Sequence, residues 1–287
     1  MKRFLVLSGG GSKGAFQTGS LAHLLGNLQT NYIGYAGVSV GAINAAFLAQ
    51  FPSGQEKEAS NEIIKMWSQL DTSRLYHNWY FMGKWAALWK TSLFDSSPMQ
   101  KLIREAISLD KIRASGKQVS VGVVSLNSGK YTVFDQTSNH FIDAVIASAS
   151  FPGLLTPVAF DGHLWADGGV KMISPIATAI DLGADEIDAI ITSPETRIKN
   201  FIEHPRTIDI MKRSIDLSSD KIMANDLERV KMYNLLSDAG LTNKKKININ
   251  LIRPEFNLIE DLLDFDPNKI RRMMDLGYEA AQKIMDK

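Results

Sequence analysis

Residues 4–16 are FLVLSGGGSKGAF, four apolar residues followed by a glycine-rich loop and the start of a new apolar segment. A short apolar run bounded by glycines is typical of a buried strand. We expect a helix over 15–28, a second strand over 32–36 and a small-residue helix over 40–49. The order strand, glycine loop, helix, strand, tight turn, helix predicts an α/β fold with a parallel sheet.

The rest of the chain continues this pattern. Alternating apolar residues over 119–126 and 131–134 flank Asn127-Ser128-Gly129-Lys130, which predicts a hairpin. Two more strands are expected over 187–192 and 247–252. Further helices are expected over 56–70, 97–107, 141–150, 225–239 and 268–285. No Pro/Gly/Ser-rich linker divides the chain, so a single domain over residues 1–287 is expected.

Composition excludes several classes of function. The net charge of +1 gives no reason to expect nucleic-acid binding. The chain has no cysteine, which excludes disulfides, zinc–thiolate sites and cysteine nucleophiles. No apolar stretch approaches the roughly 18 residues of a membrane span, and no metal-ligand spacing occurs. We expect a soluble, cytoplasmic protein that needs no metal or cofactor.

The glycine loop has four interpretations. Gly9, Gly11 and Gly14 match the dinucleotide fingerprint, but no acidic residue precedes Glu56, and the fingerprint needs one roughly 20 positions on. A P-loop needs Gly-Lys before Ser or Thr, whereas Lys13 precedes Gly14. Converging backbone N–H groups at a helix N-terminus can instead bind an oxyanion. The remaining alternative is a tight turn that packs a helix on the sheet.

A candidate nucleophile lies between the second expected strand and its helix. Gly37-Val38-Ser39-Val40-Gly41 is a G-x-S-x-G sequence in the strand-to-helix context of a nucleophile elbow. A Ser-His-Asp triad would need a histidine. His204 is the only one after Asp167, and we expect it at the surface. The other histidines, expected to be structural, are His23, His77, His140 and His163.

A candidate base lies further along the chain. Asp167 precedes Gly168 and Gly169, and an Asp before glycines most often forms a turn. Here a short apolar segment precedes it, so Asp167 can also end a strand. A carboxylate in that position could take the proton of Ser39 directly.

Taken in order, these motifs resemble the patatin-like phospholipase family, as does Ala147-Ser148-Ala149-Ser150-Phe151-Pro152. The resemblance implies a three-layer α/β/α sandwich with a mostly parallel central sheet. It implies calcium-independent hydrolysis of lipid acyl esters by a Ser-Asp dyad, with Ser39 as nucleophile and Asp167 as base. The oxyanion hole would be the N–H groups of Gly10, Gly11 and Ser12. The supporting motif residues are Gly9, Lys13, Gly14, Gly37, Gly41, Gly168 and Gly169. Lys13 stands where the family often has arginine, and it keeps the positive charge but lacks the planar fork needed for bidentate hydrogen bonds.

The resemblance favours a phospholipase A or lysophospholipase acting on a phospholipid or another acyl-ester lipid. An acyltransferase or a thioesterase could use the same dyad, and a non-catalytic lipid- or phosphate-binding module is a further alternative. A module of that kind would need neither Ser39 nor Asp167.

Two segments suggest a peripheral membrane contact. Phe81, Trp85 and Trp89 are spaced to share one helix face, which suits a bilayer interface, a lid over an acyl channel, or packing on the core. Lys244-Lys245-Lys246 would be a second lipid contact or a solvated loop.

Overall fold

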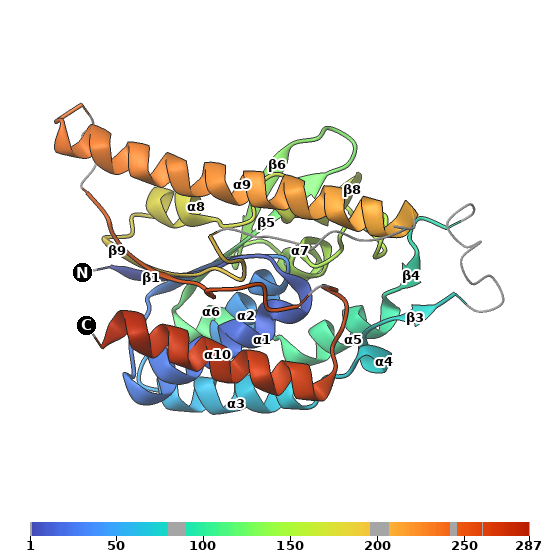
Figure 1. The fold of residues 1–287 in the computed structure, drawn as a ribbon, viewed down its shortest axis with the longest axis horizontal. Coiled ribbons are helices and arrows are strands. Elements are labelled where there is room, and N and C mark those ends of the chain that lie inside the picture. The colour runs from blue at the N-terminus through green and yellow to red at the C-terminus, as the bar shows by residue number, and fades with distance from the viewer. Residues whose placement is uncertain (1, 80–89, 196–206, 242–245, 260, 287) are drawn as a thin grey trace.

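The computed structural model describes residues 2–79, 90–195, 207–241, 246–259 and 261–286 (Figure 1). Its main strands are β1 (Arg3–Leu7), β2 (Gly34–Val38), β5 (Gln118–Ser125), β6 (Tyr131–Asp135), β7 (Val158–Phe160), β8 (His163–Asp167), β9 (Glu186–Ile190) and β10 (Asn248–Ile252). Within the described ranges they form one sheet in the order β10-β9-β1-β2-β5-β8-β7, with β6 paired to β5. The first five of these are parallel, whereas β6 and β8 run antiparallel to β5.

Helices cover both faces of the sheet (Figure 1). One layer contains α1 (Gly14–Leu21), α2 (Val40–Leu48), α3 (Glu56–Ser68), α5 (Ser97–Ala106), α6 (Leu109–Ser115), α7 (Phe141–Ser148) and α10 (Pro267–Met285). The opposite layer contains α8 (Ile176–Asp181) and α9 (Thr207–Asp238). Beside the first layer lie α4 (Thr72–Leu75) and a two-stranded sheet of β3 (His77–Asn78) and β4 (Phe94–Asp95).

The central strand shows why two layers are needed. Phe4 and Val6 of β1 pack into the core under α8 and α9, while Leu5 and Leu7 pack into the core under α1 and α2. Side chains of a strand alternate between faces, so a continuous apolar run requires cover on both sides. The predicted three-layer α/β/α arrangement with a mostly parallel sheet is therefore confirmed.

Most expected elements occur within a few residues of their predicted ranges, with two corrections. The strand expected over 32–36 is β2, two residues further on; Ile33 already accepts from Gln118 N–H at 3.0 Å, so pairing starts before the regular strand. The helix expected over 225–239 is the C-terminal part of α9, whose true start at Thr207 the prediction missed. Its earlier turns carry the buried Asp216, which interrupts the apolar spacing.

The two expected membrane-contact segments lie largely outside the described residues, as does His204. Phe81, Trp85 and Trp89 are not described, and of the lysine run only Lys246 is, in an ion pair with Asp238. None of the helices in the described part of the chain is both long and apolar enough to cross a bilayer.

Candidate active site

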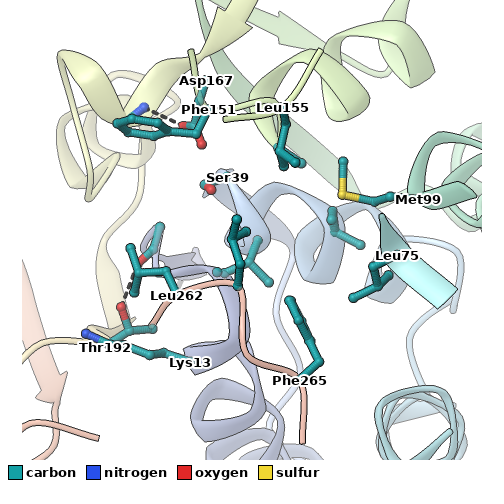
Figure 2. A pocket seen from close by; sticks show the side chains of 18 of the residues that line it. Lys13, Ser39, Leu75, Met99, Phe151, Leu155, Asp167, Thr192, Leu262 and Phe265 are labelled. Carbon is teal, nitrogen blue, oxygen red and sulfur yellow. Dashed lines mark hydrogen bonds between the residues drawn. The ribbon is translucent and has the colours of Figure 1, made fainter. Parts of the chain in front are cut away.

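Strand register brings Ser39 and Asp167 together. Val38, the last residue of β2, pairs with Gly122 of β5, and Asp167, the last residue of β8, pairs with the next β5 residue, Val123. The other edge of β5 is occupied by β6, so β2 and β8 lie along the same edge and end toward each other. The chain leaves β2 at Ser39, directly beside Asp167 (Figure 2).

Ser39 occupies a sharp turn between β2 and α2. Its backbone angles are φ 58° and ψ −130°, a conformation that is strained for a residue with a side chain. The flanking glycines allow the turn because there is no room for a side chain. A Cβ at Gly37 would lie 2.2 Å from the Gly41 carbonyl oxygen, and a Cβ at Gly41 would lie 2.2 Å from that of Leu7. This is the geometry of a nucleophile elbow.

The last residue of α7 and the segment that follows it hold Ser39 and Asp167 in place. Ser148 Oγ accepts a hydrogen bond from Ser39 N–H at 2.9 Å and donates to the Gly122 carbonyl at 2.7 Å. Two residues on, the Ser150 carbonyl accepts from Asp167 N–H at 3.0 Å. Sequence reasoning singled out this segment by resemblance but did not find this role, because the role depends on pairing across the sheet.

Burial changes the chemistry of Asp167. Removal from water raises the pKa of its carboxyl to about 7, although hydrogen bonds from Gly169 N–H and from the Ser39 side chain act in the opposite direction. The Gly169 N–H lies 2.7 Å from Oδ1. A carboxyl with a pKa close to neutrality can both take up and release a proton at physiological pH.

The three residues predicted to donate to the oxyanion do not all lie at the cavity. Gly10 and Gly11 line the same cavity as Ser39 and Asp167. Ser12 N–H instead donates to the Leu262 carbonyl at 2.8 Å, and Ser12 is absent from the cavity wall. A Cβ at Gly11, where φ is 56°, would lie 2.2 Å from the same carbonyl oxygen. The structure thus places two of the three predicted donor residues, Gly10 and Gly11, on the cavity wall and pairs the N–H of the third with the C-terminal segment.

The other motif residues support this arrangement. A Cβ at Gly14 would lie 2.4 Å from Val40 Cγ2, and a Cβ at Gly168 would lie 2.4 Å from the Gly122 carbonyl oxygen. Gly9 faces Ser39, with its Cβ position 3.2 Å from that of the serine. The Lys13 side chain is buried at the cavity wall, and its Nζ lies 3.5 Å from Asn257 Oδ1.

An apolar cavity of about 290 Å³ opens from this site (Figure 2). Its apolar lining includes Ile43, Trp67, Leu75, Met99, Leu102, Ala106, Leu155, Leu262 and Phe265. Trp67 is held by a hydrogen bond to Asn44 and stacks on Phe265. Trp67 is therefore a buried core residue and is not available to contact a membrane surface.

Histidines are absent from the part of this cavity wall that the structure describes. His163 pairs with Ser125 at 3.0 Å and His23 with Asp286 at 3.1 Å, both away from Ser39. Within the described ranges, no group of three or more His, Asp or Glu side chains is arranged to hold a metal ion.

Comparison with known proteins places the chain in a family. The model of the patatin-like phospholipase family matches residues 5–180, more than half of the chain. An uncharacterized protein of Acanthamoeba polyphaga mimivirus is 27% identical over 265 residues, covering 88% of this chain and 79% of the relative.

Solved structures with a related outline are more distant. The crystal structure of VipD from Legionella pneumophila gives a TM-score of 0.48 at 14% identity and covers 99% of this chain and 66% of VipD. The heterodimeric ExoU–SpcU complex from the type III secretion system of Pseudomonas aeruginosa gives a TM-score of 0.37 at 13% identity. That match covers 100% of this chain and 51% of the matched chain. This chain therefore spans only about half to two thirds of their length. The family match, in contrast, contains both Ser39 and Asp167, and the chain belongs to the patatin-like phospholipase family.

Proposed function

We propose that this protein is a serine acyl hydrolase that cleaves carboxylic esters of phospholipids, of the phospholipase A or lysophospholipase type. Membership of the family supports lipid hydrolysis at the general level. The observation that carries the specific proposal is the pairing of Ser39, on a strained elbow, with the buried carboxyl of Asp167 at the head of an apolar cavity.

The proposed reaction has two halves. Ser39 Oγ attacks the ester carbonyl carbon while its proton passes to Asp167, and the resulting oxyanion is held by the N–H groups of Gly10 and Gly11. The C–O bond to the leaving alcohol or lysolipid then breaks, and Asp167 returns the proton to that oxygen. Water next attacks the acyl-enzyme with Asp167 as base, and release of the fatty acid restores Ser39.

The properties of Asp167 support its role as a base without histidine. An ordinary aspartate has a pKa of 3.8 and is a poor proton acceptor at neutral pH. With its pKa raised to about 7 by burial, Asp167 is half ionised near neutrality and is a stronger base once ionised.

The lining of the cavity favours an apolar acyl chain as the part of the substrate that binds beside Ser39. The cavity walls are mainly aliphatic and aromatic, which suits the hydrocarbon chain of an acyl ester. We further propose that residues 1–287 act as one domain, since β1 and β10 share one sheet. A cytoplasmic location and a peripheral membrane contact stay predictions.

The test is active-site labelling with a fluorophosphonate, followed by release of fatty acid from phosphatidylcholine vesicles. We expect labelling of the wild type and none of Ser39→Ala or Asp167→Asn, with both variants folded by circular dichroism. Addition of a primary alcohol to the vesicle assay separates hydrolysis from acyl transfer. A folded wild type that neither labels nor releases fatty acid would refute the proposal and favour a binding module.

A further inference from the structure

Thr192 lies against the glycine loop from outside the segment that matches the family. It follows β9 by two residues, beyond residue 180, and is 1% exposed. Its side chain forms part of the wall of the cavity that holds Ser39 (Figure 2). The reaction proposed above gives this residue no role.

Hydrogen bonds to both the carbonyl and the N–H of Gly9 hold this residue in place. Thr192 Oγ1 donates to the Gly9 carbonyl at 2.5 Å, and Ser8 Oγ donates to the same oxygen at 3.1 Å. Ser8 Oγ in turn accepts from Thr192 N–H at 3.0 Å, so the two side chains hold each other. On its other side, Gly9 N–H donates to the Ile173 carbonyl at 3.0 Å.

These contacts determine where Gly10 N–H points. The Gly9 carbonyl and the Gly10 N–H belong to one planar trans peptide, in which the two groups point in opposite directions. Because Thr192 holds the carbonyl on its own side, the N–H must point away from Thr192. Among the described residues, no hydrogen-bond acceptor for Gly10 N–H is found.

We propose that Thr192 is a positioning residue, whose hydroxyl orients the Gly9–Gly10 peptide so that Gly10 N–H is directed at the carbonyl oxygen of the reacting ester. This inference rests on the proposed function. The loop lies close against Thr192, because a Cβ at Gly10 would lie 2.3 Å from Thr192 Oγ1, so only glycine fits at this position. Donors fixed before the reaction need no reorganisation as charge develops.

The test compares three substitutions with a matched control. Thr192→Val replaces the hydroxyl by a methyl group that cannot donate, Thr192→Ala removes it without adding bulk, and Thr192→Ser keeps it. Thr18→Val is the control, because Thr18 is also buried and also donates to a carbonyl, that of Gly14 at 3.2 Å within α1.

Turnover of p-nitrophenyl butyrate is the first measurement. Complete removal of an oxyanion donor costs ~10²–10³ in kcat, and a misdirected donor should cost roughly 10- to 100-fold. We expect this loss in kcat with KM within about twofold for the Val and Ala variants, and near wild-type kcat for Thr192→Ser and Thr18→Val. Wild-type kcat in Thr192→Ala, or an equal loss in the Ser variant, would overturn the inference.

The second measurement does not depend on activity. In the ¹⁵N-labelled protein, the Gly10 amide resonance should move in the Val and Ala variants and return toward its wild-type position in Thr192→Ser. If the wild type fails to label with fluorophosphonate, the proposed function fails but this resonance still decides whether Thr192 orients the peptide. A Gly10 resonance that is unmoved in Thr192→Ala would overturn the inference.

Discussion

Replacing Asp167 by Asn should abolish turnover and at the same time stabilise the folded protein at alkaline pH. Burial raises the pKa of this carboxyl to about 7, against 3.8 for an ordinary aspartate. Folding therefore favours the protonated form. The stabilising contribution of that form is fully present below about pH 3.8 and is lost as the pH rises through 7, where the fold must hold a buried charge. Asn is similar in shape and does not titrate.

The size of the effect follows from the difference between the two pKa values. Full ionisation of a group shifted from 3.8 to about 7 costs about 4 kcal/mol of unfolding free energy. Part of that cost already applies at pH 5, because the unfolded chain is ionised there. Between pH 5 and pH 8 the advantage of Asp167→Asn over the wild type should grow by about 3 kcal/mol.

Urea unfolding followed by tryptophan fluorescence, run at pH 5 and pH 8, measures this difference. Each variant serves as its own control, since any change in packing or hydrogen bonding caused by Asn is the same at both pH values. A difference in unfolding free energy between Asp167→Asn and wild type that stayed constant from pH 5 to pH 8 would show that the buried carboxyl does not titrate as reasoned.

Three further predictions follow from the site. Since only the ionised carboxylate of Asp167 accepts a proton, kcat/KM should rise with pH through about 7 and be about tenfold lower at pH 6 than at pH 8; a flat stopped-flow profile would exclude this base. Ser148→Ala leaves Ser39 N–H and a carbonyl without their partner and should cost about 1–3 kcal/mol in urea unfolding. Ser150→Ala, which removes only a hydroxyl bonded to the preceding helical turn, should cost less, and equal costs would contradict the assignment. Ala106→Trp should lower kcat/KM for p-nitrophenyl laurate relative to butyrate by roughly tenfold or more by filling the cavity; an unchanged ratio would place the acyl chain elsewhere.

The first fifty residues were the most predictable part of the molecule. Glycines mark the ends of β1 and β2, and the small residues of α2 predict burial, so local signals were sufficient to place Ser39 on an elbow. Asp167 could be proposed from its neighbours and paired with Ser39, but the strand register that brings the two together could not be predicted, because the pairing of β2 and β8 with β5 is a property of the assembled sheet.

Long-range contacts account for what the sequence did not reveal. Ser12 N–H meets a carbonyl 250 residues away at Leu262, and Thr192 reaches the loop from the carboxyl end of β9, the parallel neighbour of β1. Neither contact has a local signature, because a backbone acceptor can belong to any residue type and a lone threonine fits any strand end. The early turns of α9 were missed for a related reason, since its buried Asp216 resembles a solvent-facing residue in sequence.

The position of β1 in the sheet also has a consequence for synthesis on the ribosome. One of its edges is covered early by β2, but the other pairs with β9, which is translated roughly 180 residues later. At about 5–20 residues per second, that edge and the face bearing Phe4 and Val6 wait roughly 10–35 s for their partners. A nascent chain with an open, apolar strand edge is prone to self-association. A chain stopped at residue 180 would keep this edge permanently bare, and we expect it to aggregate even though it retains both Ser39 and Asp167.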